Sequence, residues 1–294
     1  MFLSGIADEA GRDAGRQVQA HRELGWSRIE LRNIEGVNAT DLPDDRFDAL
    51  TDLLAGAGLG VSCFASQIAN WSRPIASPLD KDVAELRRAI PRMRRLKTPF
   101  IRVMSYPNAQ PPWVEADWRR ESIRRMRELT RIAEDAGIVL VHENCSGWGG
   151  LSPRATLDLL GEVPSPALRL VFDTGNPAQY GLDSWDYYRQ VREHVVYVHI
   201  KDYLAPEHKG DERASFPGEG ICHIREIISD LLSRGYDGGF SIEPHIASVI
   251  HRHKDIQDPD LAYRTYIEYG RRLEHLLGGI CAEAEFQAGR PRLA

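Results

Sequence analysis

Eight short apolar segments alternate with longer helical patterns along the chain, and this alternation constrains the fold most strongly. The segments read as buried strands at residues 2–7, 28–31, 60–65, 100–104, 138–141, 168–172, 195–198 and 240–242. Each is followed by a stretch of helical periodicity, the last of which spans residues 259–277. Alternation of this kind indicates parallel β-α units. Eight units in 294 residues predict an α/β (β/α)₈ TIM barrel, with one domain over residues 1–278 and a C-terminal tail over 279–294.

An open, doubly wound parallel sheet is the competing architecture. Such a sheet normally carries a G-x-G-x-x-G turn after its first strand. Gly5, Gly11 and Gly15 do not have that spacing, and no Pro/Ser-rich linker divides the chain. The sequence therefore favours the closed barrel.

Composition narrows the class of partner. The net charge of −6 argues against nucleic acid or an acidic membrane as the main partner. The four cysteines are far apart without a C-x-x-C pair, and the first residues do not have the pattern of a signal peptide. No apolar stretch approaches the ~18 residues that span a membrane. We therefore predict a cytoplasmic protein with a small-molecule substrate, and the sequence leaves open whether it forms a homo-oligomer.

Polar side chains stand at the C-terminal ends of four successive predicted strands, namely Glu143, Asp173, His199 and Glu243. In a barrel these ends surround one mouth, where catalytic residues lie, and adjacent strands are about 4.8 Å apart. Like charges brought together repel each other, and a bound dication removes that repulsion. Three carboxylates and one imidazole favour Mn²⁺ or Mg²⁺, with Co²⁺ and Zn²⁺ as alternatives. The alternative interpretation is that these four residues are ordinary polar groups at strand ends, each paired with a neighbouring side chain and not with a metal.

Four short motifs carry these residues: H-E-N at 142–144, F-D-T-G-N at 172–176, V-H-I-K-D at 198–202 and S-I-E-P-H at 241–245. Together they resemble the sugar-phosphate isomerase/epimerase family, which has the xylose isomerase-like TIM barrel of the AP endonuclease 2 superfamily and is related to endonuclease IV. The resemblance covers residues 1–278. It implies that Glu143, Asp173, His199 and Glu243 are metal ligands, and that the two glutamates also act as acid and base.

Two positions depart from the ketose 3-epimerases of this family. Those enzymes commonly have a histidine three residues after the metal-binding aspartate, where this chain has Asn176. They also carry a downstream arginine, for which Arg213 is the candidate. The departure argues against a free ketohexose substrate. In P-G-E-G at 217–220, Glu219 would repel phosphate, so the sequence favours an unphosphorylated substrate.

The expected activity is epimerisation or isomerisation of a keto-sugar or keto-cyclitol. A dication beside the carbonyl acidifies the neighbouring C–H, one glutamate removes that proton, and the other returns one at the opposite face. The alternative is a lyase or dehydratase, in which the enolate expels a β-substituent. Inosose dehydratases, 3-dehydroshikimate dehydratases and C-glycoside-cleaving lyases of the family have that chemistry. An endonuclease IV-like phosphodiesterase and a catalytically silent partner subunit are less favoured.

Further residues are expected around the metal. Lys201 and His245 are candidate catalytic groups, although Lys201 would equally pair with Asp202. The candidate substrate-binding residues are Asn144, Trp148, Asn176, Arg102, Arg213 and Glu30. Arg102 and Glu30 would serve equally in a salt bridge inside the barrel, and Trp148 is either a lid over the substrate or a surface aromatic. His251 and His253 add imidazoles in a loop, whereas His142 should face the core behind its strand.

Overall fold

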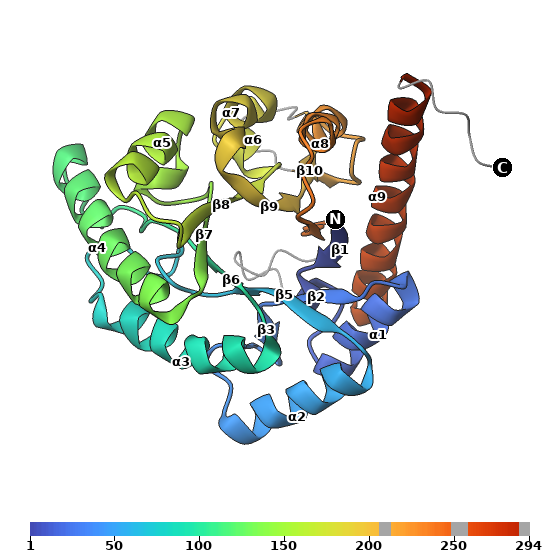
Figure 1. The fold of residues 1–294 in the computed structure, drawn as a ribbon, viewed down its shortest axis with the longest axis horizontal. Coiled ribbons are helices and arrows are strands. Elements are labelled where there is room, and N and C mark those ends of the chain that lie inside the picture. Colours follow the sequence, from blue (N-terminus) through green and yellow to red (C-terminus); the bar gives the residue numbers. More distant parts are fainter. Residues whose placement is uncertain (206–212, 248–257, 288–294) are drawn as a thin grey trace.

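The computed structural model is a ring of eight parallel strands surrounded by helices (Figure 1). It describes residues 1–205, 213–247 and 258–287. The strands of the ring are β1 (Phe2–Gly5), β2 (Arg28–Leu31), β5 (Gly60–Ala65), β6 (Phe100–Val103), β7 (Val139–Glu143), β8 (Leu168–Asp173), β9 (Val195–Ile200) and β12 (Gly239–Ile242). They correspond one to one to the eight segments expected from the sequence.

The strand order confirms the predicted barrel. The strands pair in the order β1-β12-β9-β8-β7-β6-β5-β2, and every pair is parallel. A single parallel bridge between Ile6 and Glu30 joins the two ends of this sheet. The ring is therefore nearly closed, and the open doubly wound sheet is excluded.

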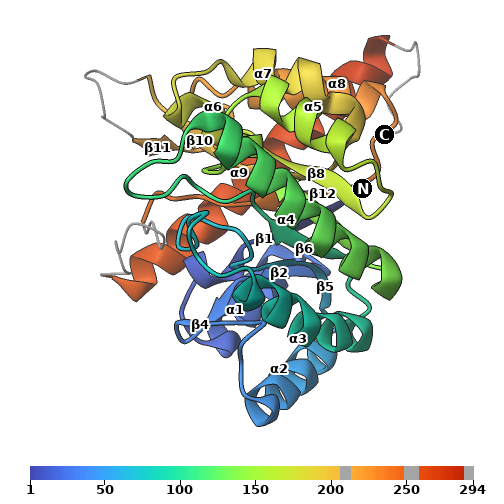
Figure 2. The same ribbon diagram turned by 90° about the vertical axis from the view of Figure 1, so that its left-hand side faces the viewer.

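Helices cover the outside of the ring, which Figure 1 shows from one end and Figure 2 from the side. The long helices are α1 (Ala14–Leu24), α2 (Asp44–Gly56), α3 (Asp80–Leu96), α4 (Glu115–Ala136), α5 (Pro153–Glu162), α7 (Ser184–Val191), α8 (Ile224–Ser233) and α9 (Pro259–Gln287). Gly25 and Gly137 end α1 and α4 with φ of 73° and 70°, the left-handed conformation that glycine adopts without strain.

The end of the last helix differs from expectation. Helix α9 continues to Gln287, ten residues beyond the predicted end at Leu277. Two glycines at 278 and 279 suggested a stop, but Leu277 and Ile280 are buried, so side-chain packing carries the helix past them. The division into a barrel over residues 1–278 and a tail over 279–294 stays a prediction. In the part of the chain that the structure describes, no helix has the length and apolar character needed to cross a membrane.

Short elements at the C-terminal ends of the strands were not expected. They are the hairpins β3 (Asn33–Ile34) with β4 (Val37–Asn38) and β10 (Asp202–Tyr203) with β11 (Ala214–Ser215), and the one-turn helix α6 (Asn176–Gln179). Asp202 accepts backbone hydrogen bonds from Gly218, Gly220 and Cys222. It therefore holds the loop after β11, and Lys201 is left to face the barrel mouth.

Successive side chains of each strand point alternately into the barrel and outward toward the helices, so they pack in two separate cores. Cys63, Val141, Val171 and Tyr197 fill the barrel interior as one apolar layer. The next inward positions, two residues further along β7, β8 and β9, are Glu143, Asp173 and His199. Residues on the opposite face pack under the helices in two larger apolar clusters. His142 is fully buried on that side, as the alternation predicts, and burial lowers its pKa to about 4.

Candidate metal centre

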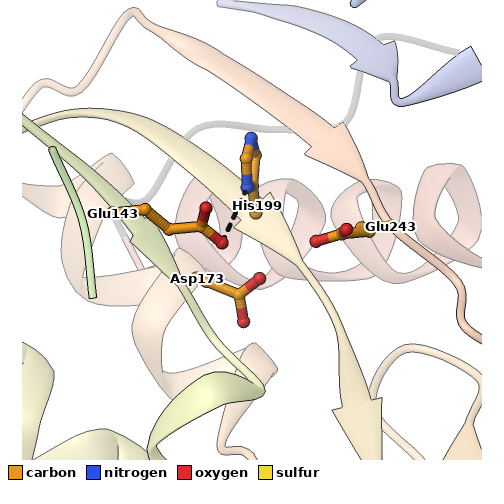
Figure 3. A group of neighbouring side chains, drawn as sticks. All are labelled: Glu143, Asp173, His199 and Glu243. Carbon is orange, nitrogen blue, oxygen red and sulfur yellow. Dashed lines mark ion pairs between the residues drawn. The ribbon is translucent and has the colours of Figure 1, made fainter. Parts of the chain in front are cut away.

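Four side chains from adjacent strands meet at the C-terminal mouth of the barrel. Glu143 ends β7, Asp173 ends β8, His199 lies near the end of β9, and Glu243 directly follows β12. One potential ligand atom from each lies within 4.8 Å of the others, and all four residues are buried. Figure 3 shows the carboxyl groups of Glu143 and Glu243 facing each other, with Asp173 and His199 between them.

One oxygen of each carboxylate on β7 and β8 is fixed by hydrogen bonds. Asn176 Nδ2 donates to Glu143 Oε1 at 3.1 Å, and the backbone N–H groups of Gly175 and Asn176 donate to Asp173 Oδ1 at 2.8 Å. The side chain of Asn144 donates to the carbonyl of Asp173 and accepts from its N–H. Asn144 thus secures the end of β8, whereas Asn176 reaches the centre of the site.

The imidazole of His199 is held by a buried carboxylate behind it. Its Nε2 lies 3.1 Å from Glu30 Oε1, while Glu30 Oε2 accepts from Ser241 Oγ at 2.6 Å and from Tyr197 Oη at 3.1 Å. With a metal bound, Glu30 would keep the proton on Nε2 and leave the Nδ1 lone pair for the ion. Without one, burial lowers the pKa of His199, but the carboxylates of Glu30 and Glu143 on either side outweigh burial and raise it to about 10. The structure therefore places Glu30 against His199 inside the barrel, which agrees with the second of the two roles, substrate contact or an internal salt bridge, that the sequence left open.

Glu243 is fixed from the other side of the barrel. Arg32 Nη1 donates to Glu243 Oε1 at 2.7 Å and also pairs with Asp8 and Glu9 at 2.9 and 3.2 Å. His245 Nε2 lies 3.2 Å from Glu243 Oε1 and 3.5 Å from Glu9 Oε1. Glu9, Glu243 and His245 thus form a second group of potential ligands. The first group offers four potential ligands and the second three, so the first group is the better metal site.

The remaining donor atom of each of the four residues is open. Glu143 Oε2, Asp173 Oδ2, His199 Nδ1 and Glu243 Oε2 are buried and have no hydrogen-bond partner within residues 1–205, 213–247 and 258–287, and they are open in that sense. The three carboxylate oxygens still lie in ion pairs: Glu143 Oε2 with Arg102 at 3.3 Å, and Asp173 Oδ2 and Glu243 Oε2 with Lys201 at 3.0 and 2.7 Å. Buried polar atoms of this kind are rare and costly. Three carboxylate oxygens and one imidazole nitrogen, each held on one side and open on the other, fit a divalent metal ion.

Formal charge points the same way. The site contains six buried carboxylates, those of Asp8, Glu9, Glu30, Glu143, Asp173 and Glu243. It contains three permanent cations, Arg32, Arg102 and Lys201. Burial raises the pKa of Glu9 to about 8, and the neighbouring carboxylates overcome burial and raise that of His199 to about 10. At neutral pH the metal-free cluster therefore has a formal excess of one negative charge, which a dication that displaces the His199 proton removes. Burial of uncompensated charge is unfavourable, so the cluster is better balanced with the ion than without it.

The two glutamates are held in their ionised form. Burial raises the pKa of Glu143, but Arg102 and His199 together outweigh burial and lower it to about 2. Burial likewise raises the pKa of Glu243, and Lys201, His245 and Arg32 together overcome this and hold it well below its usual value. For Asp173 burial prevails over the attraction of Lys201 and raises the pKa to about 6. Both glutamates can therefore accept a proton at neutral pH.

A cavity of about 150 Å³ opens onto this cluster. Its lining residues are Trp71, Arg102, Met104, Glu143, Cys145, Ser146, Asn176, Gln179, Tyr180, Lys201 and Glu243. A larger hollow of about 490 Å³ lies at the opposite end of the barrel, beside Trp26 and Leu277. That hollow contains a single carboxylate, Glu274, among its lining residues. The larger hollow exceeds the cavity in volume, but the ionisable side chains gather around the smaller cavity, which is therefore the better candidate for a substrate site.

Some residues singled out from the sequence lie away from this cavity. Trp148 is 6% exposed and packs in the outer core under α4 and α5, with Arg119 5.4 Å from its ring. Arg213 is exposed next to β11, where its carbonyl accepts from the N–H of Leu204. His245 is buried, and its Nδ1 lies 3.2 Å from Tyr203 Oη. His251 and His253 lie outside the described residues.

The sequence did not reveal Trp71, the indole that lines the cavity from the loop between β5 and α3. The guanidinium of Arg102 lies 5.8 Å from its ring centre, within the range of a cation–π contact. Two buried carboxylates at the start of α3 anchor the loop, because Arg73 pairs with Asp82 at 2.6 Å and with Glu85 at 2.5 Å. Nothing in the local sequence pattern marks Trp71, since the loop has no period and its anchor is on α3.

Arg32 and Glu9 were also not assigned a role, although a signal was present for Arg32. It stands two residues after Glu30, and alternation along β2 therefore directs both side chains into the barrel. Glu9 follows β1 in a one-turn helix (Ala7–Glu9), where alternation no longer applies. Its place beside His245 follows from barrel closure, which brings β1 next to β12.

Comparison with known proteins identifies the family. Residues 18–272 match the model described as xylose isomerase-like TIM barrel. The chain belongs to this family. Inosose dehydratase 1 of Bacillus cereus is 24% identical over 167 residues, which cover 52% of each chain. Fructoselysine 3-epimerase of Escherichia coli O157:H7 is 26% identical over 121 residues, which cover 40% of this chain and 42% of the relative. The matches thus span about half the length of these relatives or less.

Solved structures of the family have the same fold. A D-tagatose 3-epimerase-like protein superimposes with a TM-score of 0.74 at 17% identity, covering 97% of this chain and 100% of the other. A xylose isomerase-like TIM barrel protein from Mycobacterium smegmatis, solved in complex with magnesium, gives a TM-score of 0.67 at 19% identity, with 94% and 97% covered. At such identities the likeness shows the fold alone. The chain is thus a member of a family that includes sugar epimerases and inosose dehydratases.

Proposed function

We propose that this protein is a divalent-metal-dependent epimerase or isomerase of a keto-sugar or keto-cyclitol. One observation carries the proposal: the carboxylates of Glu143 and Glu243 face each other from opposite sides of one buried cluster of four potential metal ligands (Figure 3). A reaction that removes a proton from one face of a carbon and returns one to the other face requires two such groups. The family's sugar epimerases support the same reaction class.

The metal would be held by Glu143, Asp173, His199 and Glu243 through their open atoms. A set of three oxygens and one nitrogen favours Mn²⁺ or Mg²⁺ over Zn²⁺. When bound, the ion supplies Lewis-acid stabilisation of the negative charge that develops on the carbonyl oxygen of the substrate.

The protein's own groups move the proton. Glu143, ionised at neutral pH, removes the proton from the carbon beside the carbonyl, and Glu243 lies across the site on the opposite face. Because Glu243 is ionised too, the proton returned on that side comes from a neighbouring donor, which regains one from solvent while Glu143 releases its own to solvent. Lys201 Nζ is 2.7 Å from Glu243 Oε2, so a protonated group is at hand on that side for the return step. Arg32 and Asn176 hold the two carboxylates in place through their other oxygens.

The cavity supports a small, unphosphorylated substrate. Its volume of about 150 Å³ lies well below the ~300 Å³ at which pockets for drug-sized ligands begin, and so suits a single ring. Both cations of its lining are paired with carboxylates: Arg102 with Glu143 at 3.3 Å, and Lys201 with Glu243 and Asp173. A phosphate would have to compete with these pairs. Asn176, Gln179 and Ser146 offer neutral partners for hydroxyl groups.

A dehydratase or lyase acting through the same enolate is the second candidate. Lys201 lines the cavity beside Glu243, where it could protonate a departing hydroxyl, whereas burial lowers the pKa of His245 to about 4 and leaves that residue neutral at pH 7. The alignment to inosose dehydratase 1 also covers more of this chain than the alignment to fructoselysine 3-epimerase. Both features favour elimination over simple return of the proton.

Incubation in D₂O with Mn²⁺ separates the two candidates. Fructoselysine, an inosose and 3-dehydroshikimate would be followed by NMR, with Glu143→Gln and Glu243→Gln variants as controls. Deuterium entering next to the carbonyl without loss of water supports the epimerase, and loss of water supports the dehydratase. Absence of both reactions with a metal-loaded protein contradicts both candidates for these substrates.

A further inference from the structure

The ammonium group of Lys201 contacts two of the four open donor atoms. Its Nζ lies 3.0 Å from Asp173 Oδ2 and 2.7 Å from Glu243 Oε2. It also donates to Asn176 Oδ1 at 3.2 Å. Only 3% of the residue is exposed, so the charge is directed into the cluster and away from solvent.

The chain builds this position for the lysine. The backbone N–H of Lys201 donates to Thr174 Oγ1 at 2.9 Å, and that hydroxyl donates to the carbonyl of Lys201 at 2.7 Å. The aliphatic stem passes over Gly175, where an added Cβ would lie only 2.8 Å from Lys201 Cγ. The backbone and the stem are therefore fixed, and the ammonium group is placed among the carboxylates by the fold.

The other cations of the site are placed differently. Arg32 contacts Glu243 through Oε1, the oxygen that faces away from the cluster. Arg102 approaches one open atom, Glu143 Oε2, at a longer distance of 3.3 Å, and its Nη2 is committed to the carbonyl of Ser66. Lys201 is thus the cation that touches the open oxygens of two ligands at once.

We propose that Lys201 is an internal counter-cation that competes with the divalent metal for Asp173 Oδ2 and Glu243 Oε2 and so keeps the metal exchangeable. A dication and an ammonium group that share the same two oxygens repel each other across a few ångströms of poorly screened interior. The lysine also balances the two carboxylates when the metal leaves. The inference rests on the metal site of the proposed function, but not on the identity of the substrate.

Replacing Lys201 should therefore strengthen metal binding, whereas replacing a metal ligand would weaken it. Lys201→Met removes the charge and keeps much of the stem, so the metal-free variant should bind Mn²⁺ at least about tenfold more tightly than the wild type. The metal-free variant should also melt at a lower temperature, and Mn²⁺ should raise its Tm by more than it raises that of the wild type.

The test is a calorimetric titration of the metal-free proteins with MnCl₂, repeated with MgCl₂. Lys81→Met is the matched control, because Lys81 is exposed on α3 and loses the same charge far from the site. Its affinity should equal that of the wild type. Lys201→Gln serves as a second variant, since it stays polar and should also gain affinity. If Lys201→Met does not fold without metal, the Gln variant decides.

Unchanged or weaker Mn²⁺ binding by the folded Lys201 variants overturns the inference. If the Lys201 variants bind Mn²⁺ and the wild type does not, the inference is supported, because Lys201 then prevents metal binding in the wild type. If neither wild type nor variants bind Mn²⁺ or Mg²⁺, both the inference and the metal-dependent function fall. A gain in affinity without any reaction in the D₂O experiment leaves the inference in place and contradicts the proposed activity.

Discussion

Glu30 Oε1 lies 3.1 Å from His199 Nε2, so a carboxylate on β2 orients an imidazole on β9 across the barrel interior. Both residues are fully buried, and Glu30 has further donors in Ser241 and Tyr197. A carboxylate in this position fixes the tautomer of a metal-binding histidine and raises the basicity of its free nitrogen.

Removing the charge of Glu30 should therefore weaken metal binding without removing a ligand. We expect Glu30→Gln to lower Mn²⁺ affinity by about 10- to 100-fold, the range seen when partners of metal ligands are changed. Titration calorimetry measures the effect, with Glu134→Gln on the exposed face of α4 as the control. Equal affinities in Glu30→Gln and the wild type would show that Glu30 does not orient His199 for a metal.

Arg32 should be a large contributor to stability. Its guanidinium pairs with three buried carboxylates, those of Asp8, Glu9 and Glu243. Removing one partner of a buried ion pair leaves uncompensated charge, so Arg32→Met should lower the free energy of unfolding by about 3–5 kcal/mol. Urea denaturation of the metal-free protein measures this change.

Arg46→Met provides the comparison for Arg32. Arg46 pairs with Glu35 in a more exposed setting, where an ion pair contributes at most about 1 kcal/mol. Similar losses of stability in the two variants would contradict the structural role assigned to Arg32.

The indole of Trp71 should affect substrate binding more than turnover. It lines the cavity beside Arg102 but is not among the groups proposed to move protons. Trp71→Ala should raise KM for a reactive substrate by about tenfold and leave kcat within a factor of a few, because it removes contact with the ring and not with the reacting atoms. Trp113→Ala, which removes a more exposed indole, should change neither constant. A fall in kcat at unchanged KM would mean that Trp71 acts on the chemical step.

Stability should fall as the solution is acidified, in part through His21. Burial lowers the pKa of His21 from 6.5 to about 4, despite the opposing hydrogen bond to the carbonyl of Gln17. The unfolded chain therefore binds a proton that the folded protein does not, and this residue costs stability progressively as pH falls from 6.5 to 4. A shift of this size corresponds to about 3 kcal/mol.

His21→Gln should flatten the dependence of unfolding free energy on pH over that range by about one proton. His275→Gln, at an exposed position on α9, should not. Urea denaturation at several pH values gives the two slopes. Identical slopes in His21→Gln and the wild type would show that His21 is protonated equally in both states.

The eight strands and the four proposed ligands were predictable because both depend on local patterns. An apolar run followed by a polar residue marks each strand end, and alternation sends Glu143, Asp173 and His199 inward from the positions above Val141, Val171 and Tyr197. Parallel strands then bring these ends to one mouth. The meeting of these four side chains could therefore be predicted without knowing which distant segments of the chain contact each other.

The surroundings of the ligands depend on contacts between distant segments, and these were not predictable. Glu9 reaches His245 because β1 pairs with β12, and Glu30 reaches His199 because the barrel closes between β1 and β2. Trp148 looked like a lid among glycines, but it packs in the core, because the loop after β7 turns toward α5. Trp71 lines the cavity instead, because Arg73 in the same loop pairs with Asp82 and Glu85 of α3.

A crystal grown or soaked with Mn²⁺ and measured for anomalous scattering tests the metal centre most directly. We predict one strong anomalous peak at the barrel mouth, within about 2.0–2.3 Å of an atom from each of Glu143, Asp173, His199 and Glu243. The absence of a peak at this position from a protein saturated with Mn²⁺, or a peak held by other residues, would contradict the assignment.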